Sequence, residues 1–125
     1  MAYTLLNPKD KVSTQSGWKV VERVDGWVEV SREVTVTIAS TAWVSLGQIL
    51  EAKVSDAFTF PVTFTQRPYL QVLPYRVEGY SINGFEITAN SNAHTVFPSI
   101  WVLRSTRPPN NTTVGVALIA SGPVS

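Results

Sequence analysis

An alternating run from position 57 to 72, AFTFPVTFTQRPYLQV, constrains the fold of this chain most. Its apolar side chains recur at every second position, at Phe58, Phe60, Val62 and Phe64, with Thr or Pro between them. A period of two is typical of a β-strand with one face in a core and the other in solvent. Burying each phenylalanine contributes roughly 1.5–3 kcal/mol relative to exposure. We therefore expect a core strand here.

Prolines divide this run and its continuation. Pro68 follows Gln66 and Arg67 and ends the first strand, and a second strand is expected over residues 69–77. Pro61 and Pro74 lack a backbone N–H group. Both strands are therefore expected at a sheet edge or beside a bulge.

The clearest hairpin signal is Asp25-Gly26, which separates strand-like runs over residues 18–24 and 27–38. This dipeptide favours a type I′ turn, in which both central residues have positive φ. In the second run Arg32 interrupts a row of apolar residues at even positions, which indicates a bulge or the point where the strand leaves the core.

A second such signal is Asn83-Gly84, between expected strands at 80–82 and 85–88. The segment 39–42 reads as a small turn. The remaining expected strands cover residues 43–50, which could instead form one helical turn, 96–103 and 113–120. The strand at 96–103 has both faces apolar, as in a strand buried on two sides.

These segments predict an all-β fold, an antiparallel β-sandwich of about seven to nine short strands. Residues 1–16 show no periodicity and are expected to be an extended lead-in or linker. Residues 17–125 are expected to form a single β-sandwich domain.

Composition excludes several classes of function. Charged residues make up 15%, against about 25% in an average globular protein, and the net charge is +1, so no nucleic-acid partner is expected. The chain has no cysteine, which excludes disulfides and thiolate metal sites. No apolar run approaches the length of a membrane span and no signal peptide is visible, so no membrane insertion is expected.

Charge is unevenly distributed along the chain. All nine acidic residues lie at or before Glu86, and the last 39 residues carry Arg104, Arg107 and His94 without a carboxylate. This pattern is compatible with a local preference for anions, but two solvated arginines on an ordinary surface are the favoured interpretation.

The inventory of catalytic side chains is thin. His94 is the only histidine, and it lies in a turn-like segment without a nucleophile motif. The nearest candidates for paired carboxylates are Glu22, Glu29 and Glu33. They occupy solvent-facing strand positions, so we interpret them as solvated cross-strand partners of nearby basic residues. No enzyme activity, metal site or cofactor is therefore expected.

Binding residues are easier to find after position 75. Sugar recognition uses an exposed aromatic ring against the apolar face of the sugar and polar side chains for its hydroxyls. The same residue types also anchor subunit interfaces. The candidates for ligand binding are Tyr75, Arg76, Tyr80, Asn90, Asn92, His94, Arg104, Arg107 and Asn110.

The stretch GWKVVERVDGWVEVSREVTVTI, at residues 17–38, resembles the distal modules of phage and prophage tail-fibre or minor structural proteins of Gram-positive hosts. The shared pattern is a Gly-Trp-Lys start, a DG hairpin and a Thr-Val-rich strand, and it extends over most of residues 17–106. The resemblance implies a homotrimer at the tail tip of the virion, made in the host cytoplasm and in contact with other tail proteins.

A second resemblance is to H-type lectins. It rests on an F-x-x-x-F-x-x-x-P run, a Gly-Phe strand start and a tryptophan in the penultimate strand, matched by Phe60, Phe64, Pro68, Gly84, Phe85 and Trp101. It implies an antiparallel sandwich that trimerises and binds N-acetylgalactosamine-like sugars. The chain departs from that family by a short 89–95 loop without its Trp-His pairing and by an extra strand after Arg107.

Together these resemblances predict a non-catalytic phage tail tip domain, lectin-like and receptor-binding, that binds host cell-surface glycan. The alternative is a structural trimerisation or connector module with no ligand of its own. A glycan hydrolase ranks below both.

Overall fold

The computed structural model describes residues 10–54, 58–77, 82, 84–87 and 94–124. Within these residues the chain forms eleven strands and one 3-10 turn, η1. The elements are β1 (Lys11–Gln15), β2 (Trp18–Glu22), β3 (Trp27–Ile38), η1 (Ser40–Ala42), β4 (Val44–Leu46), β5 (Ile49–Val54), β6 (Phe58–Thr59), β7 (Tyr69–Val77), β8 (Gly84–Ile87), β9 (Val96–Phe97), β10 (Ile100–Arg104) and β11 (Thr112–Pro123). No helix among them is long and apolar enough to cross a membrane.

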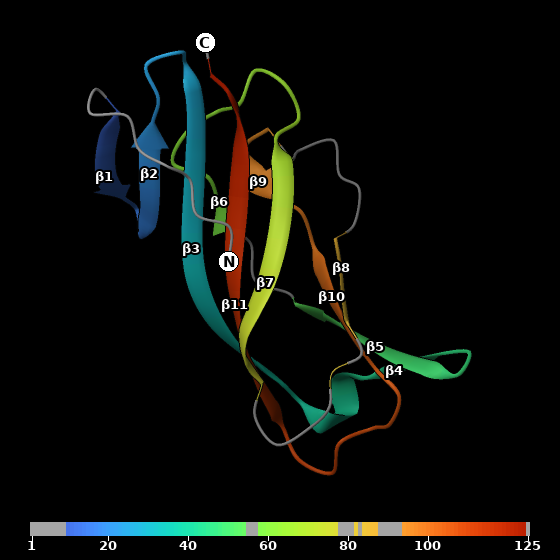
Figure 1. Cartoon of the computed structure of the whole chain (residues 1–125). Coiled ribbons are helices and arrows are strands. Elements are labelled where there is room, and N and C mark those ends of the chain that lie inside the picture. The colour runs from blue at the N-terminus through green and yellow to red at the C-terminus, as the bar shows by residue number, and fades with distance from the viewer. Residues whose placement is uncertain (1–9, 55–57, 78–81, 83, 88–93, 125) are drawn as a thin grey trace.

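The strands form a five-stranded sheet, β1-β2-β3-β11-β7, a four-stranded sheet, β4-β5-β10-β8, and the small pair β6-β9 (Figure 1). Every strand pair is antiparallel. The core contains side chains from both large sheets, such as Val30 and Leu118 from one and Ala52 and Val102 from the other. The predicted all-β antiparallel sandwich is therefore confirmed, with more strands than the expected seven to nine.

β3 and β11 form the long centre of the five-stranded sheet. They pair without a register shift from Trp27↔Pro123 to Thr112↔Ile38. The expectation of a bulge or exit at Arg32 is therefore wrong. Arg32 keeps its place on the core face, where its Cζ lies 5.8 Å from the centre of the Phe58 ring, a distance at which a guanidinium is attracted to an aromatic face.

The phenylalanine run enters the core as predicted, with Phe58, Phe60 and Phe64 buried. The prediction of one strand from 57 to 64 is wrong, because β6 ends at Thr59 and only an isolated bridge, Phe64↔Val124, follows. Pro61 cannot donate to a ladder. The backbone instead makes single bonds, from the Phe60 and Phe64 N–H groups to the carbonyls of the turn at residues 94–95 (2.8 and 3.0 Å).

β7 agrees with the proline argument. It is an edge strand of the five-stranded sheet, and its register with β11 shifts between Gly115 and Val116. Because Gly115 pairs with Arg76 and Val116 with Pro74, Tyr75 is the extra residue of a bulge. The expectation that Pro74 lies at an edge or beside a bulge is confirmed on both counts.

The hairpin between β2 and β3 is confirmed, but its predicted type I′ turn is wrong. Gly26 has φ +84° while Asp25 does not have positive φ. The Gly26 N–H donates to the Arg23 carbonyl (3.1 Å) and the Arg23 N–H to the Trp27 carbonyl (2.9 Å). This is the longer hairpin loop in which a turn is followed by a glycine in the left-handed region.

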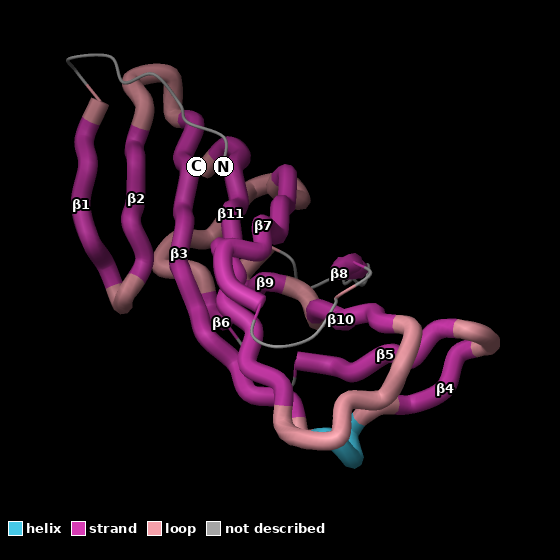
Figure 2. The backbone as a smooth tube through the Cα atoms, turned by 60° about the horizontal axis from the view of Figure 1, so that its bottom comes forward, coloured by secondary structure: helices cyan, strands magenta, loops and turns pink. Residues whose placement is uncertain are grey.

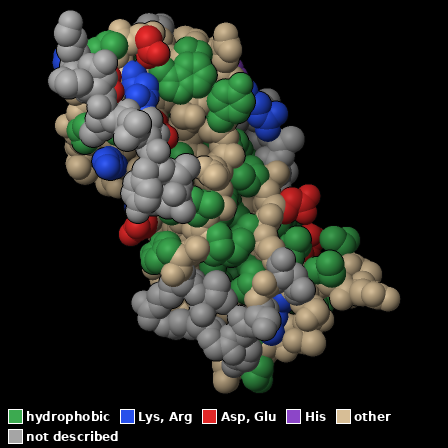
Figure 3. Space-filling model, in the orientation of Figure 1, with side chains coloured by type: hydrophobic (Ala, Val, Ile, Leu, Met, Phe, Trp, Pro, Cys, Tyr) green, Lys and Arg blue, Asp and Glu red, His purple; other side chains and the backbone are tan. Residues whose placement is uncertain are grey.

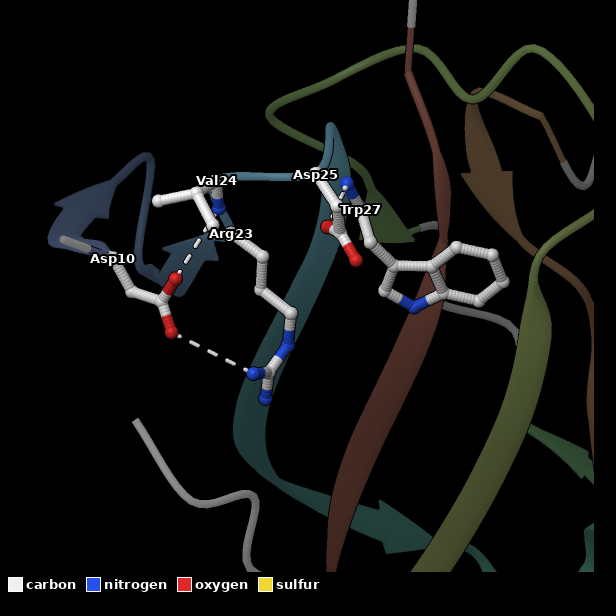
Figure 4. A network of polar contacts seen from close by, with 5 residues as sticks. All are labelled: Asp10, Arg23, Val24, Asp25 and Trp27. Atoms are coloured by element: carbon white, nitrogen blue, oxygen red, sulfur yellow. Dashed lines mark hydrogen bonds and ion pairs between the residues drawn. The ribbon is translucent and has the colours of Figure 1, made fainter. Parts of the chain in front are cut away.

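Asp10 fixes this turn from outside the hairpin (Figure 4). One oxygen accepts a hydrogen bond from the Val24 N–H (3.2 Å) and the other pairs with Arg23 Nη1 (3.5 Å). Asp25 caps the turn from within by accepting from the Trp27 N–H (3.0 Å). The carboxylate of Asp10 therefore ties the segment before β1 to the turn after β2.

The expected lead-in over residues 1–16 is wrong for residues 11–15, which form β1 and pair with β2 from Lys11↔Glu22 to Gln15↔Trp18. Residues 1–9 lie outside the described residues. The connecting turn is Ser16-Gly17, with φ +52° and +85°, so the two-residue turn with positive φ at both positions occurs here rather than at Asp25-Gly26.

The expected single strand at 43–50 is also wrong, because it is a hairpin. β4 and β5 pair from Val44↔Glu51 to Leu46↔Ile49, around a turn in which Gly47 has φ +63°. The preceding segment 39–42 contains η1, as its turn chemistry suggested. The β4-β5 hairpin projects from the body of the molecule (Figure 2).

β8 and β10 complete the four-stranded sheet, from Ile100↔Ile87 to Leu103↔Gly84. Most of the predicted hairpin at Asn83-Gly84 lies outside the described residues. The expected strand at 96–103 is split into β9 and β10, and two-sided burial is wrong for it, since Trp101 and Leu103 are only half-buried. β11 is the strand that is buried on both faces, from Val114 to Ala120.

Candidate functional site

A hollow of about 460 Å³ opens on the face of the five-stranded sheet that points away from the core. We call it the outer hollow. It is lined by Thr14, Gly17, Lys19, Ser31, Arg32, Glu33, Ala117 and Ile119. It forms where the β1-β2 hairpin ends, because β2 pairs with β3 only as far as the pair Lys19↔Ser31. Beyond that pair β3 continues beside β11 without cover from β2.

Strand register places four of the lining residues in one row across the sheet. Thr14 is opposite Lys19, Lys19 is opposite Ser31, and Ser31 is opposite Ile119. The pair Glu33↔Ala117 forms the next row on the same face. Directly opposite residues have Cβ atoms about 4.5–5.5 Å apart and diagonal neighbours about 7–8 Å. The row from Thr14 to Ile119 therefore spans about 14 Å, and its side chains line the hollow side by side.

The lining residues with polar side chains are Thr14, Ser31, Lys19, Glu33 and Arg32, the last from the core-facing row of β3. Within the part of the chain that the structure describes, none of them forms a hydrogen bond or ion pair. Ammonium groups only donate, carboxylates only accept, and hydroxyls do both. The hollow thus offers every kind of hydrogen-bonding group that a polyhydroxy ligand needs.

The floor of the hollow is apolar. Ala117 and Ile119 are buried side chains of β11 that complete the lining between the polar groups. An apolar surface with a few convergent polar groups is the usual composition of small-molecule sites. Among the described residues no group of three His, Asp or Glu side chains is placed to hold a metal ion.

Aromatic side chains flank the hollow along the same sheet face. Toward one end Trp27 stacks on Tyr69, with ring centres 6.2 Å apart and planes at 28°. Toward the other end the hydroxyl of Tyr75 is hydrogen-bonded to that of Thr35 (3.2 Å). Figure 3, drawn from the side of this sheet, shows hydrophobic side chains grouped over β3, β11 and β7. Tyr69 is 75% exposed, so its ring is open to a partner.

The sequence-predicted candidates do not come together. Tyr80, Asn90 and Asn92 lie outside the described residues, as does the side chain of Arg76, although its backbone pairs with Gly115 in the sheet. Tyr75 is half-exposed on the outer sheet face. His94 is partly buried in a turn, and its carbonyl accepts a hydrogen bond from the Phe64 N–H (3.0 Å).

Arg104 corrects the expectation of a solvated surface arginine. It is 4% exposed, at the end of β10 on the core-facing side. Its Cζ lies 5.7 Å from the centre of the buried Trp43 ring, and Nη2 donates to the Thr106 hydroxyl (3.3 Å). The guanidinium therefore holds Trp43 and the following loop in place.

Arg107 and Asn110 are both exposed in the loop between β10 and β11. Arg107 Nη1 donates to the Ser40 carbonyl (3.1 Å), and Asn111 Oδ1 accepts from the Ser40 N–H (3.3 Å). Two side chains of this loop thus bind the backbone of η1. Arg107 acts here as a structural contact between the loop and η1.

The glutamates considered for acid-base chemistry do not form a pair. Glu29 and Glu33 share the outer face of β3, but four residues of strand separate them by about 13 Å. Glycosidase carboxylates are about 5–9.5 Å apart. Glu22 pairs with Val28, whose side chain points into the core, so Glu22 lies on the opposite face of the sheet.

Sequence reasoning missed the residues of the outer hollow. The alternation in residues 27–38 placed Ser31 and Glu33 on the wet face, but only as solvated positions. Thr14 was assigned to a lead-in, and the cross-strand row that joins it to Lys19 depends on register. The Ser16-Gly17 dipeptide was the available signal for that hairpin.

Comparison with known proteins finds no matching family model, no matching curated protein and no matching solved structure.

Proposed function

We propose that this chain is a non-catalytic recognition domain of a phage tail that binds host cell-surface glycan in the outer hollow. The single observation behind the ligand class is a set of polar side chains around an apolar floor, none of which has a hydrogen bond or ion pair among the described residues. Sugar hydroxyls would accept from Lys19 and donate to Glu33, and the C–H face of a ring would lie on Ala117 and Ile119. The setting in a phage tail is supported by the resemblance of residues 17–106 to distal tail modules.

Exposed aromatics extend the proposal from one sugar to a chain of sugars. Tyr69 lies toward one end of the hollow and Tyr75 toward the other, both on the outer face and both exposed. A ring at each end would stack on sugar units that leave the hollow in either direction. Several copies in one tail would raise a weak affinity by avidity, by about 10²–10⁴ when geometry allows simultaneous binding.

A glycan array printed with neutral, N-acetylated and acidic oligosaccharides tests this proposal, followed by calorimetry with the strongest glycan. The wild-type chain should bind, and Glu33→Gln should weaken binding at least tenfold, because a hydrogen bond to a charged group contributes about 1.5–3 kcal/mol. Glu86→Gln, an exposed glutamate on β8, is the matched control and should bind like wild type.

Absence of binding to every printed glycan contradicts the proposal. Equal binding by the wild type and the Glu33→Gln variant contradicts the assignment to the hollow, because among the described lining residues Glu33 alone has a side chain that only accepts hydrogen bonds.

One observation favours the second candidate, a trimerisation or connector module of the tail. Val44, Leu46 and Ile49 on the β4-β5 hairpin are large apolar side chains that are 60%, 57% and 39% exposed. Such a patch is typical of a surface that other chains cover. A connector would keep host attachment after the Glu33→Gln change and lose it when the hairpin surface is altered.

A further inference from the structure

The β4 strand and the turn that follows it carry no charge. Residues 43–50, WVSLGQIL, contain no Asp, Glu, Lys or Arg. Val44, Leu46 and Ile49 share one face of the hairpin, since Leu46 pairs with Ile49 and Val44 is two residues from Leu46 along the same strand. Glu51, the partner of Val44, borders this face and is partly buried. That face points away from the core, because Leu50, on the other face, packs against the core cluster.

β4 is also an edge strand, the last in the order β4-β5-β10-β8. Hydrogen-bonded and non-bonded pairs alternate along an antiparallel ladder. Either Ser45, or both Val44 and Leu46, therefore direct their N–H and C=O groups away from β5. These groups form a template for another strand.

The other edges of the two large sheets carry protection against such pairing. β7 has Pro74 and the bulge at Tyr75, β1 begins with Lys11, and β8 contains Glu86. Charges, prolines and bulges are the devices by which edge strands avoid pairing with other chains. β4 has no charge, proline or bulge, and only its length of three residues limits pairing, so it is the edge that is most open to a further short strand.

We infer that β4 pairs with β4 of a second copy of this chain, antiparallel, with the two-fold axis at Ser45. The sequence Val-Ser-Leu is suited to this arrangement. In this register Ser45 faces the partner's Ser45 and Leu46 faces the partner's Val44, so apolar side chains meet and the small residue lies on the axis. The uncharged edge strand allows two identical strands to approach without repulsion. Val44, Leu46 and Ile49 of the two hairpins join into one apolar stripe, with Glu51 of each chain at its outer ends.

This inference is independent of glycan binding, because the outer hollow lies on the other sheet. It uses the same exposed residues of the β4-β5 hairpin as the assembly alternative above, and it assigns them to a two-fold pair through β4 in place of a trimer.

Light scattering after size-exclusion chromatography, over a range of concentrations, gives the first test. The wild-type chain should reach twice the 13.7 kDa chain mass as concentration rises. Leu46→Lys and Val44→Glu should each give a monomer across the range. Val12→Lys, on the edge strand β1 at a side chain that is 50% exposed, is the matched control and should dimerise like wild type. Unchanged circular dichroism and melting temperature show that each variant is folded.

The register gives a sharper test. Mixing Leu46→Lys with Val44→Glu chains should restore a dimer, because position 46 of one chain faces position 44 of the other and the two introduced charges are opposite in sign. In a mixture of Leu46→Lys and Leu46→Glu chains, each introduced charge faces the unchanged Val44 of the other chain. This mixture should therefore restore the dimer less well. A wild-type monomer at the highest concentration, a trimer, a dimer unaffected by Leu46→Lys, or equal rescue by both mixtures would each overturn the inference.

Discussion

The two hairpins β2-β3 and β4-β5 have similar turn sequences but differ in how deeply their strands are buried. Each contains a glycine with positive φ in its turn, Gly26 at +84° and Gly47 at +63°. The β2-β3 hairpin buries its strand residues and has its turn held by Asp10, whereas every residue of β4 is exposed. A hairpin signal thus predicts the local turn geometry. The surrounding side chains decide whether the strands of the hairpin are buried in the core, as part of the framework of the fold, or remain exposed on its surface.

The difference also separates two kinds of recognition. Lys19, Ser31 and Glu33 of the outer hollow stand on β2 and β3, the framework hairpin. Convergent polar groups need such support, because a binding site must hold its geometry. The apolar face of β4-β5 needs only to be accessible, and a projecting hairpin provides that. This comparison can be tested by measuring how substitutions in and around each hairpin change the free energy of unfolding.

The largest effect is expected from Trp18→Ala in β2. Trp18 is fully buried and its ring packs edge-on against Phe60, with centres 5.5 Å apart. Removing a buried tryptophan side chain should lower the free energy of unfolding by about 3–5 kcal/mol, measured by urea denaturation. A loss below about 1 kcal/mol, the size typical of an ordinary substitution, would show that β2 is not part of the framework.

Asp10→Ala should have the next largest effect. It removes the acceptor for the Val24 N–H and the partner of Arg23, and we expect a loss of about 1.5–3 kcal/mol in the same measurement. Asp10→Asn keeps one oxygen for Val24 and should lose less. If the two variants are equally stable, the stabilisation of the turn by Asp10 does not depend on the charge of its carboxylate.

Alanine substitutions of Gly26 and Gly47 compare the turns of the two hairpins directly. An alanine Cβ would meet no atom within 4 Å at either Gly26 or Gly47, so only the strain of positive φ changes, about 1–2 kcal/mol. Gly26→Ala should lower the global stability by about this amount. Gly47→Ala should lower it less, because the projecting hairpin can open without global unfolding. Equal losses would mean that both hairpins unfold as one unit with the core.

The smallest effect is expected from Leu46→Ala. At a concentration where the chain is monomeric, this exposed side chain should change the free energy of unfolding by no more than about 0.5 kcal/mol. A loss comparable to that of Trp18→Ala would place β4 in the framework and remove the contrast between the hairpins.

The sequence was sufficient for the fold class because alternation is local. The phenylalanines at 58, 60 and 64 were correctly assigned to the core, and Pro74 was correctly placed at an edge beside a bulge. Alternation did not reveal that the strand stops at Thr59, because a buried irregular segment and a strand can present the same side chains to a core.

The candidate site was not predictable in the same way. Thr14 and Ile119 lie far apart in the chain and meet only through the pairing of four strands. Arg104 was misassigned because its position beside Trp43 depends on β10 running along the core. Of the sequence-predicted binding residues, Tyr75 reached the sheet face that carries the outer hollow.

The central claim is that polar recognition and self-association reside on different hairpins. Parallel measurement of chain mass and of calorimetric affinity for the selected glycan, on Glu33→Gln and Leu46→Lys, tests it most directly. We predict that Glu33→Gln weakens glycan affinity at least tenfold and remains a dimer, while Leu46→Lys becomes a monomer and keeps its affinity per chain. Loss of both properties in one variant, or of neither in both, would contradict the claim.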